Sequence, residues 1–148
     1  MNQVLDWLYV GSVEDAEDHA ALQRAGIKAV LSLAWPIQHP DIAVKYVYFE
    51  DGKPIPDEVF YKTLSFVRQQ RRLGHKILIA CNAGVSRSPA IAIAVLHELE
   101  GYPLIEAFRT VLGRVHLAYP HQAIWNSLCR FYGQWVTMDD VWPKQGQA

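Results

Sequence analysis

The sequence predicts an α/β fold with a central, mostly parallel sheet of four to five strands flanked by helices. Short apolar runs alternate with longer amphipathic stretches, the order expected of alternating strands and helices. Hydrophobic residues make up 51% of the chain, which is enough for a packed core. The 148 residues fit the usual size of one domain. We therefore expect residues 1–148 to form a single domain, with a loosely held tail after about residue 136.

Four segments are expected to form strands, because each is a short apolar run bounded by turn-forming residues. They are residues 8–10, 29–33, 44–49 and 76–80. The last of these, KILIA, is almost wholly apolar. Such a run is typical of a strand in the middle of a parallel sheet, where both faces are covered.

Five segments are expected to form helices, because their apolar residues recur at helical spacing. They are residues 13–25, about 56–74, about 87–100, 103–112 and 121–135. Ser12 can cap the first helix with its hydroxyl, and Gly26 can end it in a left-handed conformation. Asp57 is expected to cap the second. The third contains PAIAIAVLHEL, which is apolar nearly all round and predicts a helix packed inside the domain.

Composition excludes several classes of protein. Fourteen Lys and Arg against fifteen Asp and Glu give a net charge of −1, so neither nucleic acid nor membrane is expected as a partner. No apolar run approaches the ~20 residues of a membrane span, and the N-terminus lacks the features of a signal peptide. Two cysteines are too few for a disulfide scaffold or a four-thiolate zinc site. We expect a cytoplasmic protein.

The segment CNAGVSRSP, residues 81–89, carries the chemistry. Cys81 ends a predicted strand and Arg87 begins a predicted helix, whose N-terminus offers unpaired N–H groups and a partial positive charge. Gly84 permits the backbone to curl closely between them. The planar guanidinium of Arg87 suits two oxygens of a phosphoryl group. These surroundings favour an ionised thiolate, a nucleophile suited to attack on phosphorus.

The spacing Cys81-x5-Arg87-Ser88 resembles the signature loop of the cysteine-dependent protein tyrosine phosphatases, and the wider sequence resembles their small dual-specificity branch. The similarity extends over about residues 5–135. Its further parts are LDWLYVGS at residues 5–12, GIKAVLSL at 26–33, the general-acid loop at 51–57, the helix SRSPAIAIAVL and the segment 114–131.

The resemblance implies a protein tyrosine phosphatase-like fold and hydrolysis of phosphate monoesters through a phosphocysteine intermediate. Cys81 would attack phosphorus, Arg87 would bind the phosphoryl oxygens, and Ser88 would hydrogen-bond the thiolate and assist its departure. The residues implied to bind the phosphoryl group are Asn82, Ala83, Gly84, Val85, Ser86 and Arg87. The implied substrates are proteins or peptides carrying phosphotyrosine, phosphoserine or phosphothreonine. No metal or organic cofactor is implied.

Asp51 is expected to be the general acid that protonates the leaving oxygen. Gly52 and Pro54 follow it and make a loop able to close over the site. Glu50 is the alternative if the register differs by one residue, because hydrogen-bond reach decides which carboxyl acts.

Two residues depart from the family pattern. Ala80 stands where the family usually has His, so we expect weaker activation of the thiolate and slower turnover. His121 follows Pro120 where the family often has Asn, and we expect it to touch no catalytic group. The first departure keeps open a catalytically weak, phosphate-binding module.

The loop sequence also helps to distinguish protein substrates from other phosphates, and a phosphatase from other enzymes with a similar loop. Residues 82–86 contain no Lys, unlike relatives that act on inositol phospholipids or RNA 5′-phosphates, and this disfavours such non-protein substrates. A sulfur-transfer or arsenate-reducing enzyme would share a cysteine–anion loop, but the acid-loop and helix likenesses favour the phosphatase.

The remaining cysteine and the histidines are given structural roles. Cys129 lies on an amphipathic segment and is expected to pack in the core. The six histidines lack the spacing of zinc ligands. The sequence predicts neither the physiological substrate nor the oligomeric state.

Overall fold

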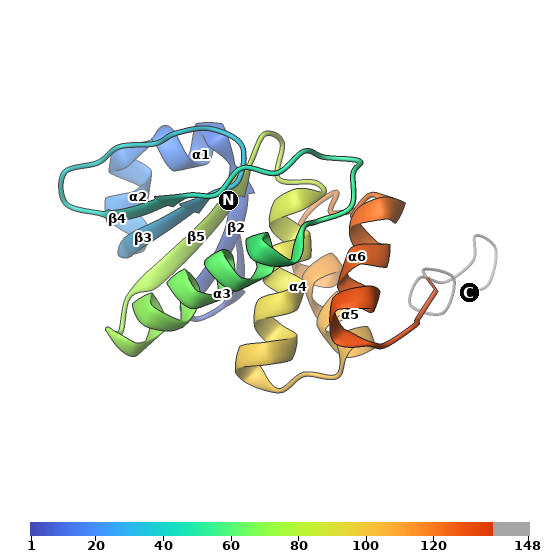
Figure 1. The fold of residues 1–148 in the computed structure, drawn as a ribbon. Coiled ribbons are helices and arrows are strands. Elements are labelled where there is room, and N and C mark those ends of the chain that lie inside the picture. Colours follow the sequence, from blue (N-terminus) through green and yellow to red (C-terminus); the bar gives the residue numbers. More distant parts are fainter. Residues whose placement is uncertain (138–148) are drawn as a thin grey trace.

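The computed structural model describes residues 1–137, and its centre is a five-stranded sheet with the order β1-β2-β5-β3-β4 (Figure 1). The strands are β1 (Asn2–Leu5), β2 (Leu8–Ser12), β3 (Ile27–Ser32), β4 (Ala43–Tyr46) and β5 (Lys76–Cys81). β1 and β2 are antiparallel, and every other neighbouring pair is parallel. The predicted α/β class and mostly parallel sheet are confirmed. The expected loose tail lies outside the described residues from residue 138 onward.

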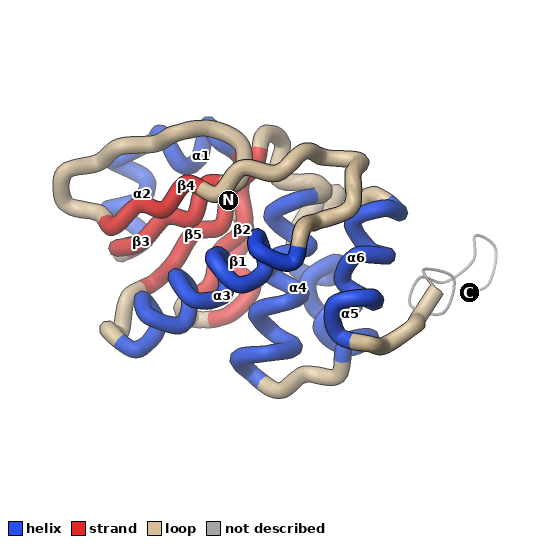
Figure 2. The backbone as a smooth tube through the Cα atoms, viewed as in Figure 1, coloured by secondary structure: helices blue, strands red, loops and turns tan. Residues whose placement is uncertain are grey.

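Helices cover both faces of this sheet (Figures 1 and 2). They are α1 (Val13–Glu17), α2 (His19–Ala25), α3 (Asp57–Arg72), α4 (Arg87–Glu100), α5 (Leu104–Arg114) and α6 (Gln122–Tyr132). The pair α1 and α2 forms the smaller layer, and the other four helices form the larger one. Within the described part of the chain, no helix is long and apolar enough to cross a membrane.

Side chains of β5 alternate between the two helical layers, as the pleat of a strand requires. Leu78 and Ala80 join the smaller apolar cluster, which contains Leu22 of α2. Ile79 and Cys81 join the larger cluster together with the apolar residues of α4. The strand is thus buried on both faces, as its apolar sequence predicts, and consecutive residues of β5 belong to different cores.

The helix expected over residues 13–25 is interrupted at Asp18, so that prediction was wrong about its continuity. Asp18 has φ −82° and ψ 85°, and its carboxylate accepts a hydrogen bond from the Ala21 N–H at 3.1 Å. Asp competes with the helical backbone for hydrogen bonds and is favoured at caps, which explains why α2 starts anew there. Ser12 caps α1 as expected, and Gly26 ends α2 with φ +73°.

The strand expected over residues 44–49 is shorter than predicted. β4 ends at Tyr46, and beyond it the Val47 N–H donates to the Ser32 carbonyl at 2.9 Å. β3 itself ends at Ser32, so the chain that follows has no strand left to pair with. β1 is an antiparallel edge strand that the sequence did not predict, because its four residues NQVL are too short to show a pattern.

Two helix ends also differ from expectation. Asp57 is the first residue of α3, not its cap: Pro56 holds the N-cap position, and no side chain hydrogen-bonds the end. The Asp57 carboxylate instead lies in the first turn, near the positive pole of the helix. The last helix was expected to reach residue 135, but α6 stops at Tyr132 because Gly133 turns left-handed with φ +64°.

Candidate active site

The carboxyl end of the central strand β5 is where the proposed nucleophile lies. Cys81 is the last residue of β5, pairs with Ser12 of β2 and is 3% exposed. Crevices beyond the carboxyl ends of parallel strands are the usual ligand sites in open α/β sheets. The neighbouring Ala80 points to the opposite layer, where it is fully buried among apolar side chains. It therefore contacts the smaller core and not the site.

Residues 82–86 form a loop between Cys81 and the first residue of α4, Arg87. Their backbone N–H groups have no hydrogen-bond acceptor among the described residues. Together with the start of the 14-residue helix α4, these free donors favour an anion beside the sulfur. The loop and helix start that the sequence predicts are thus present.

Gly84 is the residue that lets the loop turn tightly. It has φ +71°, and a Cβ placed on it would lie 3.1 Å from both the carbonyl carbon and the carbonyl oxygen of Gly11 in β2. Both obstacles are backbone atoms, which cannot rotate away. The loop therefore lies against the end of β2 as closely as a glycine allows.

Replacing Gly84 with Ala is expected to destabilise the protein by about 2–4 kcal/mol, because a left-handed Ala costs roughly 1–2 kcal/mol and the contact with Gly11 adds a similar overpacking cost. Gly74 is a matched control: it has φ +77°, but a Cβ there meets nothing within 4 Å. Gly74→Ala should lower the free energy of unfolding only by the roughly 1–2 kcal/mol that the left-handed conformation costs. Urea denaturation of both variants measures the difference, and equal losses would contradict a close contact at Gly84.

A cavity of about 420 Å³ opens over the loop. It is lined by Asp51, Cys81, Asn82, Ala83, Val85, Ser86, Arg87, Tyr119, His121 and Gln122. The structure therefore brings together, at one cavity, the proposed nucleophile, the proposed acid and most of the loop expected to bind phosphate. Gly84 and Ser88 are buried and do not line the cavity.

Arg87 reaches into the cavity from the first turn of α4 while being only 7% exposed. Its Nη1 donates a hydrogen bond of 2.9 Å to the carbonyl of Phe49, in the segment that leads to Asp51. This bond fixes one edge of the guanidinium. It also links the start of α4, next to the loop of residues 82–86, to the segment that carries Asp51.

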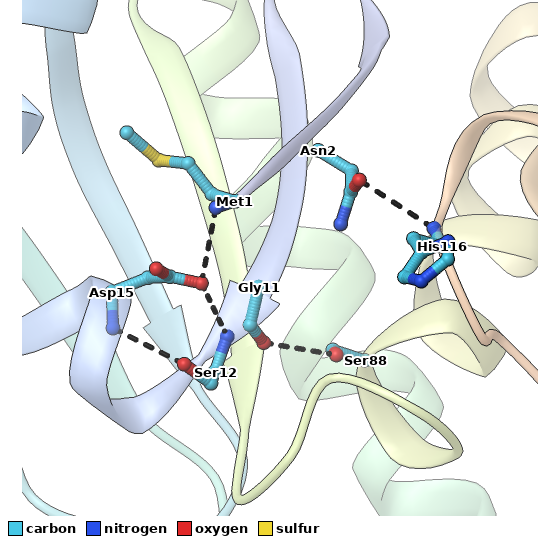
Figure 3. A network of polar contacts seen from close by, with 7 residues as sticks. All are labelled: Met1, Asn2, Gly11, Ser12, Asp15, Ser88 and His116. Atoms are coloured by element: carbon cyan, nitrogen blue, oxygen red, sulfur yellow. Dashed lines mark hydrogen bonds and ion pairs between the residues drawn. The ribbon is translucent and has the colours of Figure 1, made fainter.

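Ser88 lies next to the sulfur, as the resemblance implies. Its Oγ is 3.1 Å from Cys81 Sγ and also donates to the Gly11 carbonyl at 3.3 Å. Figure 3 shows this second contact beside the end of β2, where Ser12 and Asp15 exchange the hydrogen bonds that cap α1. The single hydroxyl proton of Ser88 thus has two acceptors within reach, the carbonyl and the thiolate form of Cys81.

Asp51 and not Glu50 lines the cavity. Ser86 Oγ donates to Asp51 Oδ1 at 2.8 Å. The end of the acid loop is anchored on α6, where Ser127 Oγ accepts a hydrogen bond of 2.8 Å from the Ile55 N–H. The register of the loop thus presents the carboxyl group of Asp51, the residue expected to be the acid.

His121 and Tyr119 also border the cavity, and sequence reasoning missed both. His121 was expected to touch no catalytic group; it lines the same cavity, and its backbone N–H donates at 2.9 Å to Ser86 Oγ, in the loop expected to bind the phosphoryl group. Its ring Nδ1 caps α6 by accepting from the Ala123 N–H. Tyr119 holds the loop through its N–H, which donates to the Val85 carbonyl at 2.7 Å. No motif signalled these contacts, since they are made by backbone groups.

Cys129 is unlike Cys81. It is 1% exposed within the larger core and lines no part of the cavity, and burial raises the pKa of its thiol. Both cysteines are free thiols. In the described residues, no group of three or more His, Cys, Asp or Glu side chains is placed to hold a metal ion.

The protein-family model described as the catalytic domain of dual specificity phosphatases matches residues 8–134 of this chain. The chain belongs to the dual specificity phosphatase family. This membership makes it a cysteine-dependent protein phosphatase by class, and it accounts for the order of strand, loop and helix around Cys81.

Relatives in sequence and structure agree with this membership. The chain is 28% identical to dual specificity protein phosphatase 1B of Arabidopsis thaliana, over 88% of this chain and 81% of that protein. It is 28% identical to dual specificity protein phosphatase 22-A of Danio rerio, over 96% and 70%. The crystal structure of human DUSP28 superposes with a TM-score of 0.83 at 26% identity, covering 90% of this chain and 96% of that one.

Proposed function

We propose that this protein hydrolyses phosphate monoesters of phosphotyrosine, and of phosphoserine and phosphothreonine, in proteins or peptides through a phosphocysteine intermediate. The observation that carries the proposal is one cavity lined by Cys81, Arg87 and Asp51. These three residues supply a nucleophile, a phosphoryl-binding cation and a proton donor.

In the first step, the Cys81 thiolate forms a bond to phosphorus while the bond from phosphorus to the leaving oxygen breaks. Asp51 gives its proton to that oxygen, which departs as an alcohol or phenol. Arg87 and the free N–H groups of residues 82–86 bind the phosphoryl oxygens. They stabilise the negative charge on these oxygens as it is redistributed in the transition state. The proposed residues thus act on both ends of the bond that breaks.

In the second step, water attacks the phosphocysteine. Asp51, now a carboxylate, accepts a proton from the water as the new bond to phosphorus forms. The electron pair of the sulfur–phosphorus bond returns to Cys81, which leaves as a thiolate. Ser88, 3.1 Å from the sulfur, stabilises the thiolate by donating a hydrogen bond from its hydroxyl.

Several features support protein substrates over other phosphates. The cavity is open beside Tyr119, whose side chain is exposed and offers an aromatic surface to a peptide. Residues 82–86 include no Lys to bind further phosphate groups of a lipid headgroup or an RNA end. Two free cysteines support a reducing compartment, and we place the reaction in the cytoplasm.

A second candidate is a phosphate-binding module with little catalysis. Ala80 favours it, because a buried methyl group at this position cannot donate or accept a hydrogen bond behind the loop. The loop, the helix end, Arg87 and Ser88 are then left to stabilise the thiolate. The two candidates predict different turnover with the same binding site.

The experiment that tests the proposal combines turnover with trapping. Wild-type protein is mixed with p-nitrophenyl phosphate, and a rapid-quench assay into denaturant with a 32P-labelled phosphotyrosine peptide detects covalently labelled phosphoprotein. Release of phosphate together with label on Cys81 supports the enzyme. Peptide binding without any turnover would establish the binding module instead. Matched peptides with phosphotyrosine, phosphoserine and phosphothreonine, an inositol phospholipid and an RNA 5′-phosphate then define the substrate class.

Asp51→Asn is expected to slow hydrolysis in proportion to how much the leaving group needs a proton. We expect kcat to fall by about 10²-fold or more for phenyl phosphate and by less than about 10-fold for p-nitrophenyl phosphate. The measurement is kcat for both esters. Glu50→Gln is the matched control, since Glu50 lies outside the cavity and should retain wild-type values. Equal loss for both esters in Asp51→Asn would contradict the assignment of the acid.

A further inference from the structure

The hydroxyl group of Ser86 occupies a helix cap position without capping the helix. Ser86 is the N-cap residue of α4, yet its side chain makes no hydrogen bond to the helix end. A Ser at this position ordinarily accepts a hydrogen bond from a backbone N–H of the first turn. Here Ser86 is 8% exposed, and its hydroxyl turns to two groups from distant segments. The orientation of the Ser86 hydroxyl away from the helix therefore calls for an explanation.

These two groups fix the direction of the Ser86 O–H bond. The backbone N–H of His121 donates to Ser86 Oγ at 2.9 Å, and Ser86 Oγ donates to Asp51 Oδ1 at 2.8 Å. A serine hydroxyl has one proton, and an N–H group can only donate. The proton therefore points to Asp51, whatever side chain residue 121 carries.

The two oxygens of Asp51 are consequently unequal. Oδ1 accepts from Ser86 Oγ and also from the Gly52 N–H at 3.0 Å. Oδ2 has no hydrogen-bond partner among the described residues. Two donors on one oxygen leave no room for a proton there. When the carboxyl group is protonated, the position open to its proton is Oδ2.

The geometry points to Ser86 as a positioning residue for the general acid: it holds Asp51 Oδ1 so that the acidic proton lies on Oδ2, available to the leaving oxygen. This inference rests on the proposed function and assigns a role to a loop residue beyond phosphate binding. The proton on Oδ2 passes to the leaving oxygen as the phosphorus–oxygen bond breaks. Ser86 keeps its bond to Oδ1 throughout, and the attacking water returns a proton to Oδ2.

The arrangement also joins the two halves of the site. Ser86 belongs to the loop that surrounds the phosphoryl group, and Asp51 belongs to the segment 47–56 above it. Because one hydroxyl links them, the acid is placed relative to the same loop that places phosphorus. A misplaced loop would then misplace the acid with it.

Ser86→Ala tests this role, with Ser86→Thr as the variant that restores the hydroxyl. For Ser86→Ala we expect kcat to fall about 10-fold for phenyl phosphate and less than about 3-fold for p-nitrophenyl phosphate. Ser86→Thr should recover most of the loss for phenyl phosphate. Ser65→Ala, an exposed serine of α3 away from the cavity, is the matched control and should behave as wild type. Thermal denaturation checks that all variants are folded.

A double variant separates positioning from a general weakening of the loop. In the Asp51→Asn background, Ser86→Ala should cost no further activity with phenyl phosphate, because residues acting as a unit are not additive. A loss in Ser86→Ala that is equal for both esters, or that persists fully in the double variant, overturns the inference while leaving the proposed function intact. Absence of hydrolysis by wild-type protein overturns both.

Discussion

Cys81→Ser is expected to lower kcat for p-nitrophenyl phosphate by about 10⁴–10⁶-fold, the range seen when a catalytic nucleophile is removed. A serine hydroxyl fits the same position, but at neutral pH it is not ionised and attacks phosphorus poorly. The loop, the start of α4 and Arg87 are unchanged in this variant. Binding of a phosphotyrosine peptide, measured by calorimetry, should therefore survive.

The second cysteine supplies the control. Cys129 is buried in α6 and lies outside the cavity. Cys129→Ser is expected to retain wild-type kcat and to lose stability by about 1–3 kcal/mol, because it places a more polar hydroxyl in the larger core, where the thiol now donates to the Val136 carbonyl at 3.5 Å. Retained turnover in Cys81→Ser, or its loss in Cys129→Ser, would contradict the assignment of the nucleophile.

Arg87→Lys is expected to reduce kcat/KM by about 10²–10³-fold, the cost of losing an aligned donor to the charge that forms in the transition state. The charge is kept, but the planar fork that binds two oxygens at once is lost. We expect weaker phosphopeptide binding together with lower kcat, because Arg87 would contact the phosphoryl group in both states. Steady-state kinetics and calorimetry measure the two effects separately.

The free energy of unfolding of Arg87→Lys must be measured together with its kinetics, because Arg87 also donates a hydrogen bond to the Phe49 carbonyl. Arg68→Lys offers the same chemical change at a surface site, where Arg68 pairs with Glu98 at 3.0 Å. It should leave kcat/KM unchanged, and its stability should shift by less than about 1 kcal/mol. An Arg87→Lys protein as active as Arg68→Lys would rule out a role for the guanidinium in catalysis.

Much of the fold was predictable because burial imposes strong patterns. The apolar run of β5 and the nearly uniform apolar helix α4 both belong to the centre of the domain, where every side chain must be covered. The errors lie where local chemistry competes with pattern. Asp18 interrupts a helix that its neighbours favour, and β1 is too short to carry an alternation.

The candidate site also has one part that the sequence predicts and one part that it does not. Cys81, the loop after it and Arg87 were predictable because strand, turn and helix follow one another within a few residues. The contacts that tie Asp51, the proposed acid, to the loop were not predictable, since residues 51, 86 and 121 are far apart in sequence. They meet through a backbone N–H and a hydroxyl, which carry no motif. The role of Ala80 became clear only when the pleat of β5 placed its methyl group in the smaller core.

The anchoring of the acid loop on α6 has a consequence for how the enzyme forms. The Ile55 N–H and the Ser127 hydroxyl are 72 residues apart, so their hydrogen bond exists only after α6 has docked. Contacts of such long sequence separation require the closure of a large loop and are slow to form. A nascent or partly unfolded chain would have Cys81 at the end of β5 without Asp51, the proposed acid, held near it. We therefore expect catalytic competence to be acquired late in folding, which would make enzymatic activity a sensitive reporter of complete folding.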